Sequence, residues 1–178
     1  MEKTKWVFDP AHTEIGFKVK HLMITNVKGR FKTYDANILT TGEDFKTAEI
    51  DFWLDPSSID TGMEQRDTHL RSADFFDVEK FKEIHFTGNT LENVDNDGSY
   101  TLWGDLTIRD VTKKIKLEVE FGGVMTDPWG NTKAGFAING KISRKEFGLT
   151  WNNVTEAGGM VVSDEVRISC EVQLIKQQ

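Results

Sequence analysis

The chain has 178 residues, a formal net charge of −7 and a single cysteine, Cys170. No apolar run approaches the roughly 18 residues that a membrane-spanning helix needs, and one cysteine excludes an intramolecular disulfide framework. The acidic balance, with a pI near 5.1, argues against nucleic acid and against stable membrane insertion. At this length we expect one domain over residues 1–178, and the lack of an apolar leader after Met1 predicts a cytoplasmic protein.

Short segments of alternating apolar and polar residues recur along the chain, which is typical of strands with one buried face. Turn sequences such as Thr41-Gly42, Gly122-Gly123 and Trp129-Gly130 separate these segments. The pattern predicts about eight antiparallel strands joined as hairpins. In chain order, the main apolar rows are Ile15, Phe17, Val19 and His21; Ala48, Ile50, Phe52 and Leu54; Leu102, Leu106 and Ile108; Ile115, Leu117, Val119 and Phe121; Phe136, Ile138 and Ile142; and Val166, Ile168, Cys170, Val172 and Leu174.

One charged segment, residues 58–86, breaks the alternation. Thr61 and Glu64 have the spacing of a capping box, in which a hydroxyl and a carboxylate satisfy free backbone donors at a helix start. Asp67 and Arg71 have the spacing of an ion pair on a helix. These signals predict a short helix from about residue 63 to residue 73, and we expect it to lie across the mouth of a barrel.

A sheet with one apolar face can pack against a second sheet or close on itself. Closure removes exposed edges, and about eight strands enclose just enough room for side chains or one slim ligand. We therefore predict an all-β antiparallel barrel of about eight strands with a short helical insert near its mouth. A packed sandwich or a filled barrel is the alternative, since the chain contains 12 Phe to fill the interior.

Catalytic and metal-binding signals are weak. The histidines, at positions 12, 21, 69 and 85, lack the spacing of metal ligands, so we expect no metal. Cys170 lies between two apolar positions and is predicted to be buried and inert. No nucleotide-binding fingerprint or nucleophile elbow is present, so we expect no cofactor and no catalytic residue. Asp67, His69 and Asp74 leave open an enzyme that performs acid and base chemistry at the mouth.

Basic side chains near the expected mouth indicate a site for an anionic head whose tail lies in the barrel, although each could instead pair with a surface carboxylate. They are His21, Lys28, Arg30, Arg66 and Arg71. The full set of residues predicted to bind a ligand is Ile15, Phe17, Val19, His21, Phe31, Ile50, Phe52, Arg66, His69, Leu106, Ile108, Leu117, Val119, Phe136 and Ile138.

Several motifs, in order over nearly the whole chain, resemble the YceI-like, polyisoprenoid-binding family. They are residues 6–13, Phe17-Lys18-Val19-Lys20-His21-Leu22-Met23, Val27-Lys28-Gly29-Arg30-Phe31, residues 58–77, residues 104–112 and Arg144-Lys145-Glu146-Phe147-Gly148-Leu149. Asp110 and Lys82 depart from the family pattern, which has glycine and proline there. The resemblance implies a lipocalin-like barrel that holds a long isoprenoid, such as a prenyl phosphate or an isoprenoid quinone, and a homodimer.

Residues and resemblance together predict a protein that transports or stores a long apolar lipid without catalysis. Three alternatives stay open at this point. One is an enzyme acting on a hydrophobic substrate at the mouth, another is a binder of fatty acids or their amides, and the third is an interaction or stress protein with a solid barrel.

Overall fold

The computed structural model describes residues 2–22, 24–94, 98–151 and 162–177. Within these ranges the chain forms an 11-stranded sheet, one α-helix and short 3-10 turns. The strands are β1 (Lys3–Phe8), β2 (Glu14–His21), β3 (Thr25–Phe31), β4 (Tyr34–Thr41), β5 (Asp44–Leu54), β6 (Ile59–Asp60), β7 (Ile84–Asn93), β8 (Ser99–Ile108), β9 (Val111–Thr126), β10 (Thr132–Ser143) and β11 (Val162–Lys176). The helix is α1 (Glu64–Arg71), and the turns are η1 (Pro10–His12), η2 (Pro56–Ser58) and η3 (Arg144–Phe147).

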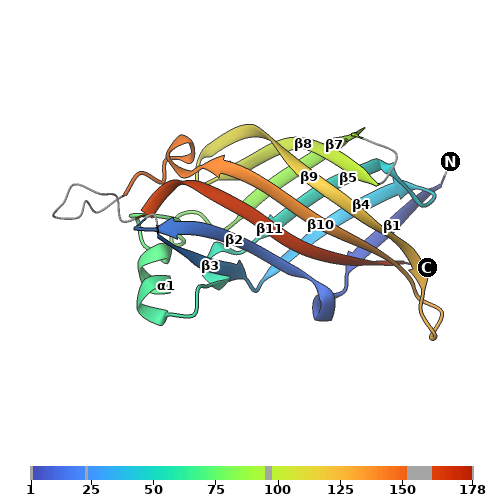
Figure 1. The fold of residues 1–178 in the computed structure, drawn as a ribbon, viewed down its shortest axis with the longest axis horizontal. Helices are drawn as coiled ribbons and strands as arrows, with labels where there is room; N and C mark the ends of the chain where they lie inside the picture. The colour runs from blue at the N-terminus through green and yellow to red at the C-terminus, as the bar shows by residue number, and fades with distance from the viewer. Residues whose placement is uncertain (1, 23, 95–97, 152–161, 178) are drawn as a thin grey trace.

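The sheet closes because β1 pairs with both β4 and β11. The closed ring runs β1-β4-β5-β7-β8-β9-β10-β11, and every neighbouring pair is antiparallel. This arrangement confirms the predicted eight-stranded, lipocalin-like antiparallel barrel and excludes the packed sandwich. Strands β2, β3 and β6 extend the sheet from β11 at the end where α1 lies, and both termini lie at the opposite end (Figure 1).

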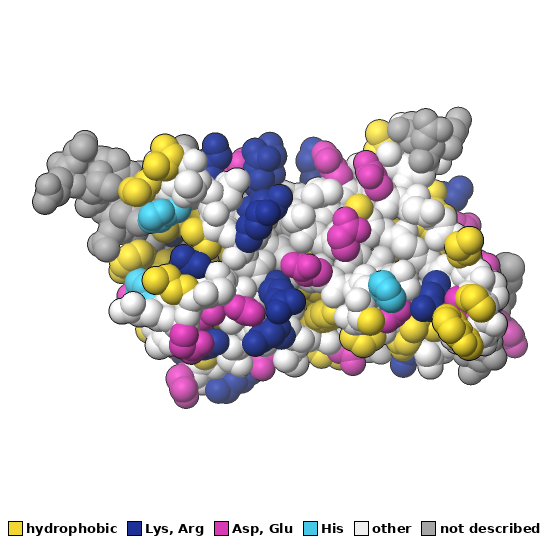
Figure 2. Space-filling model, turned by 60° about the horizontal axis from the view of Figure 1, so that its bottom comes forward, with side chains coloured by type: hydrophobic (Ala, Val, Ile, Leu, Met, Phe, Trp, Pro, Cys, Tyr) yellow, Lys and Arg dark blue, Asp and Glu magenta, His cyan; other side chains and the backbone are white. Residues whose placement is uncertain are grey.

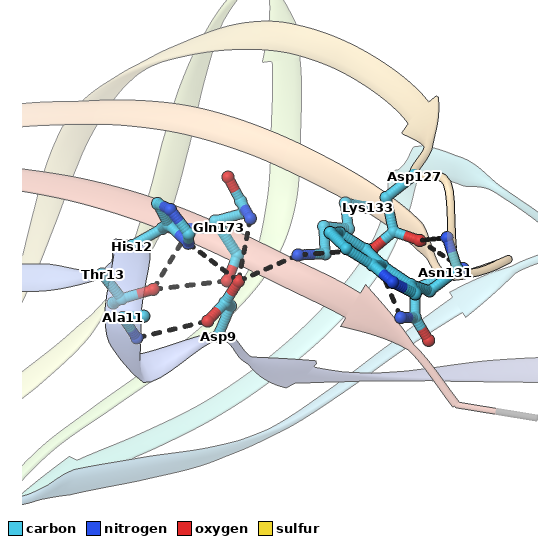
Figure 3. Close-up of polar contacts among 9 residues, drawn as sticks. Asp9, Ala11, His12, Thr13, Asp127, Asn131, Lys133 and Gln173 are labelled. Carbon is cyan, nitrogen blue, oxygen red and sulfur yellow. Dashed lines mark hydrogen bonds and ion pairs between the residues drawn. The ribbon is translucent and has the colours of Figure 1, made fainter.

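A break between β1 and β2 lets one strand, β11, pair with both of them in turn. Pro10 has no backbone N–H to continue the ladder, and η1 forms there. The buried carboxylate of Asp9 supports this turn (Figure 3). It accepts a hydrogen bond from the backbone N–H of Ala11 at 3.2 Å and lies 3.0 Å from Nδ1 of His12. It also accepts from Nζ of Lys133 at 3.2 Å and from Nε2 of Gln173 at 2.9 Å, which connects the turn to β10 and β11. Desolvation would raise the pKa of Asp9, but the hydrogen bonds with His12 and Lys133 outweigh it and lower that pKa.

The predicted apolar rows all lie on strands, because a period of two places every second side chain on the inner face. The turn expected at Gly122-Gly123 was wrong. Strand β9 continues through both glycines, and the pairing of β9 with β10 shifts register between Gly135 and Phe136. Gly123 has φ +111°, which side-chain-bearing residues rarely adopt, so these glycines allow a bulge where the sequence indicated a chain reversal.

Helix α1 forms where the charged insert predicted it, but its local contacts differ. The N-cap is Met63, without a capping side chain, so the predicted capping box of Thr61 and Glu64 is wrong. The predicted ion pair of Asp67 with Arg71 is wrong as well. Asp67 accepts from Thr61, while Nη1 of Arg71 lies 3.2 Å from Oε1 of Glu64.

Candidate functional site

The barrel encloses a cavity of about 470 Å³, a size typical of sites for small molecules. The cavity rules out the solid barrel that the sequence left open. Several side chains on its inner face, such as Phe17, Ile50 and Ile138, are only half-buried although they point inward, because a hollow rather than other atoms lies in front of them.

All residues predicted to bind a ligand lie on the cavity wall. Their elements are β2 for Ile15, Phe17, Val19 and His21; β3 for Phe31; β5 for Ile50 and Phe52; α1 for Arg66 and His69; β8 for Leu106 and Ile108; β9 for Leu117 and Val119; and β10 for Phe136 and Ile138. Lining the cavity is a structural fact for these residues, whereas contact with a ligand stays a prediction.

Aromatic rings fill the barrel at the end opposite α1, and we call them the floor: Trp6, Phe45, Phe121 and Phe136. The ring centroid of Phe45 lies 4.7 Å from that of Trp6, 5.6 Å from that of Phe121 and 4.9 Å from that of Phe136. Trp6 is completely buried, and its indole N–H donates to the hydroxyl of Thr40 at 2.9 Å. Well-packed rings of this kind leave no room for a ligand, so the cavity ends here.

Polar side chains line the cavity at the other end, which we call the mouth. The charged or titratable ones come from the last residues of β2, from α1 and from η3: Lys20, His21, Arg66, His69 and Arg144. No described residue that lines the cavity is an aspartate or a glutamate. The interior is therefore apolar along its length and basic at one end.

Arg66 is held in place at the mouth by Thr61. Its Nε donates to the Thr61 hydroxyl at 2.8 Å and its Nη2 to the Thr61 carbonyl at 2.7 Å. The Thr61 hydroxyl in turn donates to the carboxylate of Asp67, which is 3% exposed. Among the described residues no group accepts from Nη1 of Arg66, so that nitrogen has donors to offer a ligand.

His69 lies between a carboxylate and two aromatic rings. Its Nε2 is 2.9 Å from Oδ2 of Asp74, and its ring meets Trp151 and Phe75 edge-on at centroid distances of 4.5 and 5.2 Å. Asp67, the other candidate acid or base, does not line the cavity. The structure thus brings together two of the three residues that the sequence suggested for acid and base chemistry.

Other basic residues predicted at the mouth lie elsewhere. Lys28 and Arg30 do not line the cavity, and Nη2 of Arg30 lies 3.6 Å from Oδ2 of Asp60. Arg71 is also absent from the wall, since its Nε donates to the carbonyl of Ser57. His21 does line the cavity, and its imidazole has no hydrogen-bond partner among the described residues.

Arg144 is a charged residue on the cavity wall that sequence reasoning missed. It is 3% exposed and donates to the backbone carbonyls of Leu149 and Trp151, both at 2.7 Å, and to those of Val162 and Ser163 at 3.3 and 2.9 Å. Burial lowers the pKa of its guanidinium. No local pattern marks a buried arginine here, because its partners are carbonyls from both sides of residues 152–161, which are outside the described ranges.

Two further features limit the chemistry of the site. Cys170 lines the cavity, and desolvation by burial raises the pKa of its thiol to about 11, which agrees with the expected inert cysteine. Within the ranges that the structure describes, no three His, Cys, Asp or Glu side chains lie together as metal ligands, and no helix is long and apolar enough to cross a membrane.

Known proteins share this barrel. The model of the YceI-like domain matches residues 6–174. A UPF0312 protein of Staphylococcus aureus is 36% identical over 172 residues, which cover 96% of each chain. The crystal structure of a Campylobacter jejuni YCEI protein superposes with a TM-score of 0.77 at 37% identity, covering 96% of both chains.

Two more distant structures share the fold alone. Burkholderia cenocepacia BcnA gives a TM-score of 0.79 at 19% identity and covers 93% of this chain and 98% of its own. A polyisoprenoid binding domain from Saccharophagus degradans, implicated in plant cell wall breakdown, gives 0.66 at 15% identity over 97% of this chain and 98% of its own. From the domain match and the curated relative, the chain belongs to the YceI-like family.

Proposed function

We propose that this chain binds one long apolar lipid, a polyisoprenoid, inside the barrel and transports or stores it without catalysis. The observation that carries the proposal is the asymmetry of the cavity, which is apolar from the floor upward and basic at the mouth. Burial of apolar surface contributes roughly 25 cal/mol per Å², so a tail without polar groups gains affinity along the wall. A polar group midway along the tail would lose its hydrogen bonds to water.

Among long lipids we favour a polyisoprenoid because the Saccharophagus degradans barrel carries that name. We propose that the ligand contacts the wall residues predicted above and that its head lies among Lys20, His21 and Arg66. These groups favour an anionic head, since no carboxylate of the described lining competes with it. A prenyl phosphate therefore fits the mouth better than an isoprenoid quinone, whose head is neutral.

A fatty acid has the same chemistry of an apolar tail and an anionic head, and a fatty amide lacks the charge. An enzyme is the second candidate, because the His69–Asp74 pair lies at the cavity mouth and resembles an oriented general base. Loss of turnover in His69→Ala with lipid binding intact would favour the enzyme.

Extraction of the purified protein with organic solvent, followed by mass spectrometry, tests the proposal. We expect about one prenyl lipid per chain, or uptake of one when geranylgeranyl phosphate, geranylgeranyl-substituted quinone and palmitate are offered to delipidated protein. Arg66→Gln should weaken binding of the phosphate by about tenfold and leave the quinone unaffected, as expected for one charge-assisted hydrogen bond. Failure to bind any of the three lipids would contradict the proposal.

Three finer expectations belong to the proposal. The chain acts as one domain over residues 1–178, it works in the cytoplasm, and it passes its lipid to an acceptor. Fractionation of cells with an antibody tests the location, and transfer of a fluorescent prenyl phosphate between vesicle populations tests the carrier role.

A further inference from the structure

The hairpin that joins β2 to β3 carries bulky apolar side chains at its tip. Leu22 is 40% exposed and Ile24 is 78% exposed, and neither lines the cavity. The backbone N–H of Ile24 donates to the carbonyl of His21 at 3.2 Å, which closes the turn. The tip lies at the same end of the barrel as α1 (Figure 1), so its exposed side chains stand beside the mouth of the cavity.

The backbone of this tip suits another residue better than the one the sequence supplies. Leu22 has φ +54°, in the left-handed region where hairpin turns favour glycine, asparagine or aspartate. Among the described residues, Asp77 and Arg109 are the other positive-φ residues that carry a side chain, and both are charged. An exposed leucine in this conformation costs free energy in the folded chain, so it points to a contact outside the chain.

The two strands behind the tip carry only positive charge. Residues 15–34 contain five Lys or Arg and no Asp or Glu, in a chain of net charge −7. Lys20 lies two residues from Leu22, or about 7 Å along the strand. Lys18 and Lys28 lie opposite each other about 13 Å from the tip. Among the described residues, none of these three lysines has an ion-pair partner within 4.0 Å.

Figure 2 shows the same distribution on the surface. Lys and Arg side chains, in dark blue, gather in a band toward the α1 end, and hydrophobic side chains, in yellow, lie beyond the band at that end. Acidic residues between positions 60 and 74 leave the lysines of the hairpin free. Asp67 is buried, and the others have basic partners: Asp60 lies 3.6 Å from Arg30, Glu64 lies 3.2 Å from Arg71, and Asp74 lies 2.9 Å from His69.

We propose that the mouth end docks on the surface of an anionic bilayer, with the hairpin tip, Leu22 and Ile24, in the headgroup region and the three lysines against the lipid phosphates. Apolar side chains gain by leaving water, and interfacial elements bury their apolar face about 5–10 Å into the headgroups. Lys20 then reaches the headgroups, and the pair of Lys18 and Lys28 lies within roughly one Debye length of the surface. Two apolar side chains give a reversible attachment.

The opposite end of the barrel also exposes apolar side chains, but it lacks the free lysines. Met125 and Trp129, in the hairpin of β9 and β10, are both exposed. The lysine of that hairpin, Lys133, lies 3.2 Å from Oδ2 of Asp9 and 3.6 Å from Oδ2 of Asp127. The floor also closes the cavity at this end. An anionic bilayer therefore fits the mouth end better.

Sedimentation of the protein with vesicles tests the docking. Vesicles of equimolar phosphatidylcholine and phosphatidylserine contain no prenyl lipid, so docking is measured separately from lipid uptake. Only the role of docking in lipid transfer rests on the proposed function. We expect the wild type to bind these vesicles at low salt, to bind them less as salt rises, and to bind vesicles of phosphatidylcholine alone weakly.

The apolar contacts are tested by single substitutions at exposed positions. Ile24→Ser should weaken vesicle binding by at least about tenfold, because a large apolar side chain is lost from the headgroup region. Met125→Ser is the matched control, since Met125 is 77% exposed at the other end, and it should bind as wild type does. Leu22→Asn should also weaken binding, while thermal unfolding occurs at the same or a higher temperature because asparagine tolerates φ +54°.

The charged contacts are tested away from the cavity wall. Lys18→Gln with Lys28→Gln should weaken binding by about tenfold or more at low salt, as expected for two basic residues near a charged surface, and have little effect at high salt. Neither lysine lines the cavity, so uptake of geranylgeranyl phosphate from solution should stay unchanged. Lys5→Gln with Lys46→Gln changes the net charge equally at exposed sites elsewhere and should leave vesicle binding intact.

The proposal would be overturned by a wild type that does not bind the mixed vesicles, by equal binding to both kinds of vesicle, or by Ile24→Ser binding as tightly as wild type. Loss of binding in Met125→Ser would overturn it too, because the opposite end would then be the docking site. A prenyl lipid extracted from a chain that ignores vesicles would overturn the docking and support the proposed function. Vesicle binding without uptake of any lipid would do the reverse.

Discussion

The hydroxyl of Thr61 accepts a hydrogen bond from Nε of Arg66 at 2.8 Å and so sets the direction of a guanidinium at the cavity mouth. Thr61→Val removes this contact and also takes a donor from the buried carboxylate of Asp67. We expect a loss of about 1–3 kcal/mol in the free energy of unfolding, measured in urea. Binding of geranylgeranyl phosphate should weaken by about tenfold, measured by a fluorescent competitor.

Thr68→Val is the matched control, because Thr68 is an exposed residue on the same helix. Its stability and lipid affinity should stay within error of wild type. Equal effects of the two substitutions would mean that Thr61 does not position Arg66.

Filling the cavity should block lipid binding without adding charge. Ile50→Trp enlarges a half-buried side chain that borders the hollow, so the indole has space in the delipidated protein. We expect lipid retention to fall at least about tenfold, measured by extraction and mass spectrometry, at an overpacking cost of about 1–3 kcal/mol. Asn37→Trp, on the exposed face of the adjacent strand β4, should retain the lipid. If Ile50→Trp retained the lipid fully, the space beside Ile50 would not be part of the binding site.

Acid should reveal the contribution of Asp9. Because its pKa is lowered in the folded protein, Asp9 stabilises the fold above its unfolded pKa of about 3.9, and this stabilisation is lost as pH falls through the folded value. Asp9→Asn should therefore cost about 1–3 kcal/mol at pH 7, and the difference from wild type should shrink below about pH 4. Urea unfolding at a series of pH values measures this. A difference that is constant with pH would show that the charge of Asp9 contributes nothing.

Arg144 should be required for stability. Arg144→Met keeps an apolar stem but leaves several buried carbonyls without donors, and we expect a loss of about 2–4 kcal/mol. Arg144→Lys keeps the charge but can reach fewer carbonyls, so it should be more stable than Arg144→Met and less stable than wild type. Thermal unfolding compares the two, with Lys145→Met as an exposed neighbour that should be neutral.

Cys170 should resist alkylation. With its pKa near 11 and its side chain buried, the thiol is almost entirely protonated at pH 8. We expect iodoacetamide to label the folded protein at least about a hundredfold more slowly than the urea-unfolded chain, as followed by mass spectrometry. Rapid labelling of the folded form would contradict the burial of this side chain.

The barrel could be predicted from the sequence because alternation is a local signal. Leu117 and Val119 point inward because every second residue of a strand does. The same alternation predicted the other strands whose apolar rows line the cavity. The hollow itself could not be predicted, since the same apolar rows would also suit a filled interior. Whether the side chains of opposite walls meet at the centre depends on the distances between strands, which the pattern of the sequence does not give.

The mouth was predicted less well because its contacts are not local. Gly62 has φ +84° and turns the chain between Thr61 and α1, so the threonine meets Asp67 instead of capping the helix. Arg144 belongs to a turn that looks solvated in the sequence, and its burial depends on carbonyls up to 19 residues away. The spacing of residues along the sequence indicates neither the contact of Thr61 with Asp67 nor the burial of Arg144.

The aromatic floor limits the length of tail that the cavity can hold. A chain entering tail first stops against Phe45 and Phe136, and any units beyond the depth of the tunnel remain outside it. Isoprenoids of increasing length should therefore gain affinity with each unit up to one length and gain nothing after it.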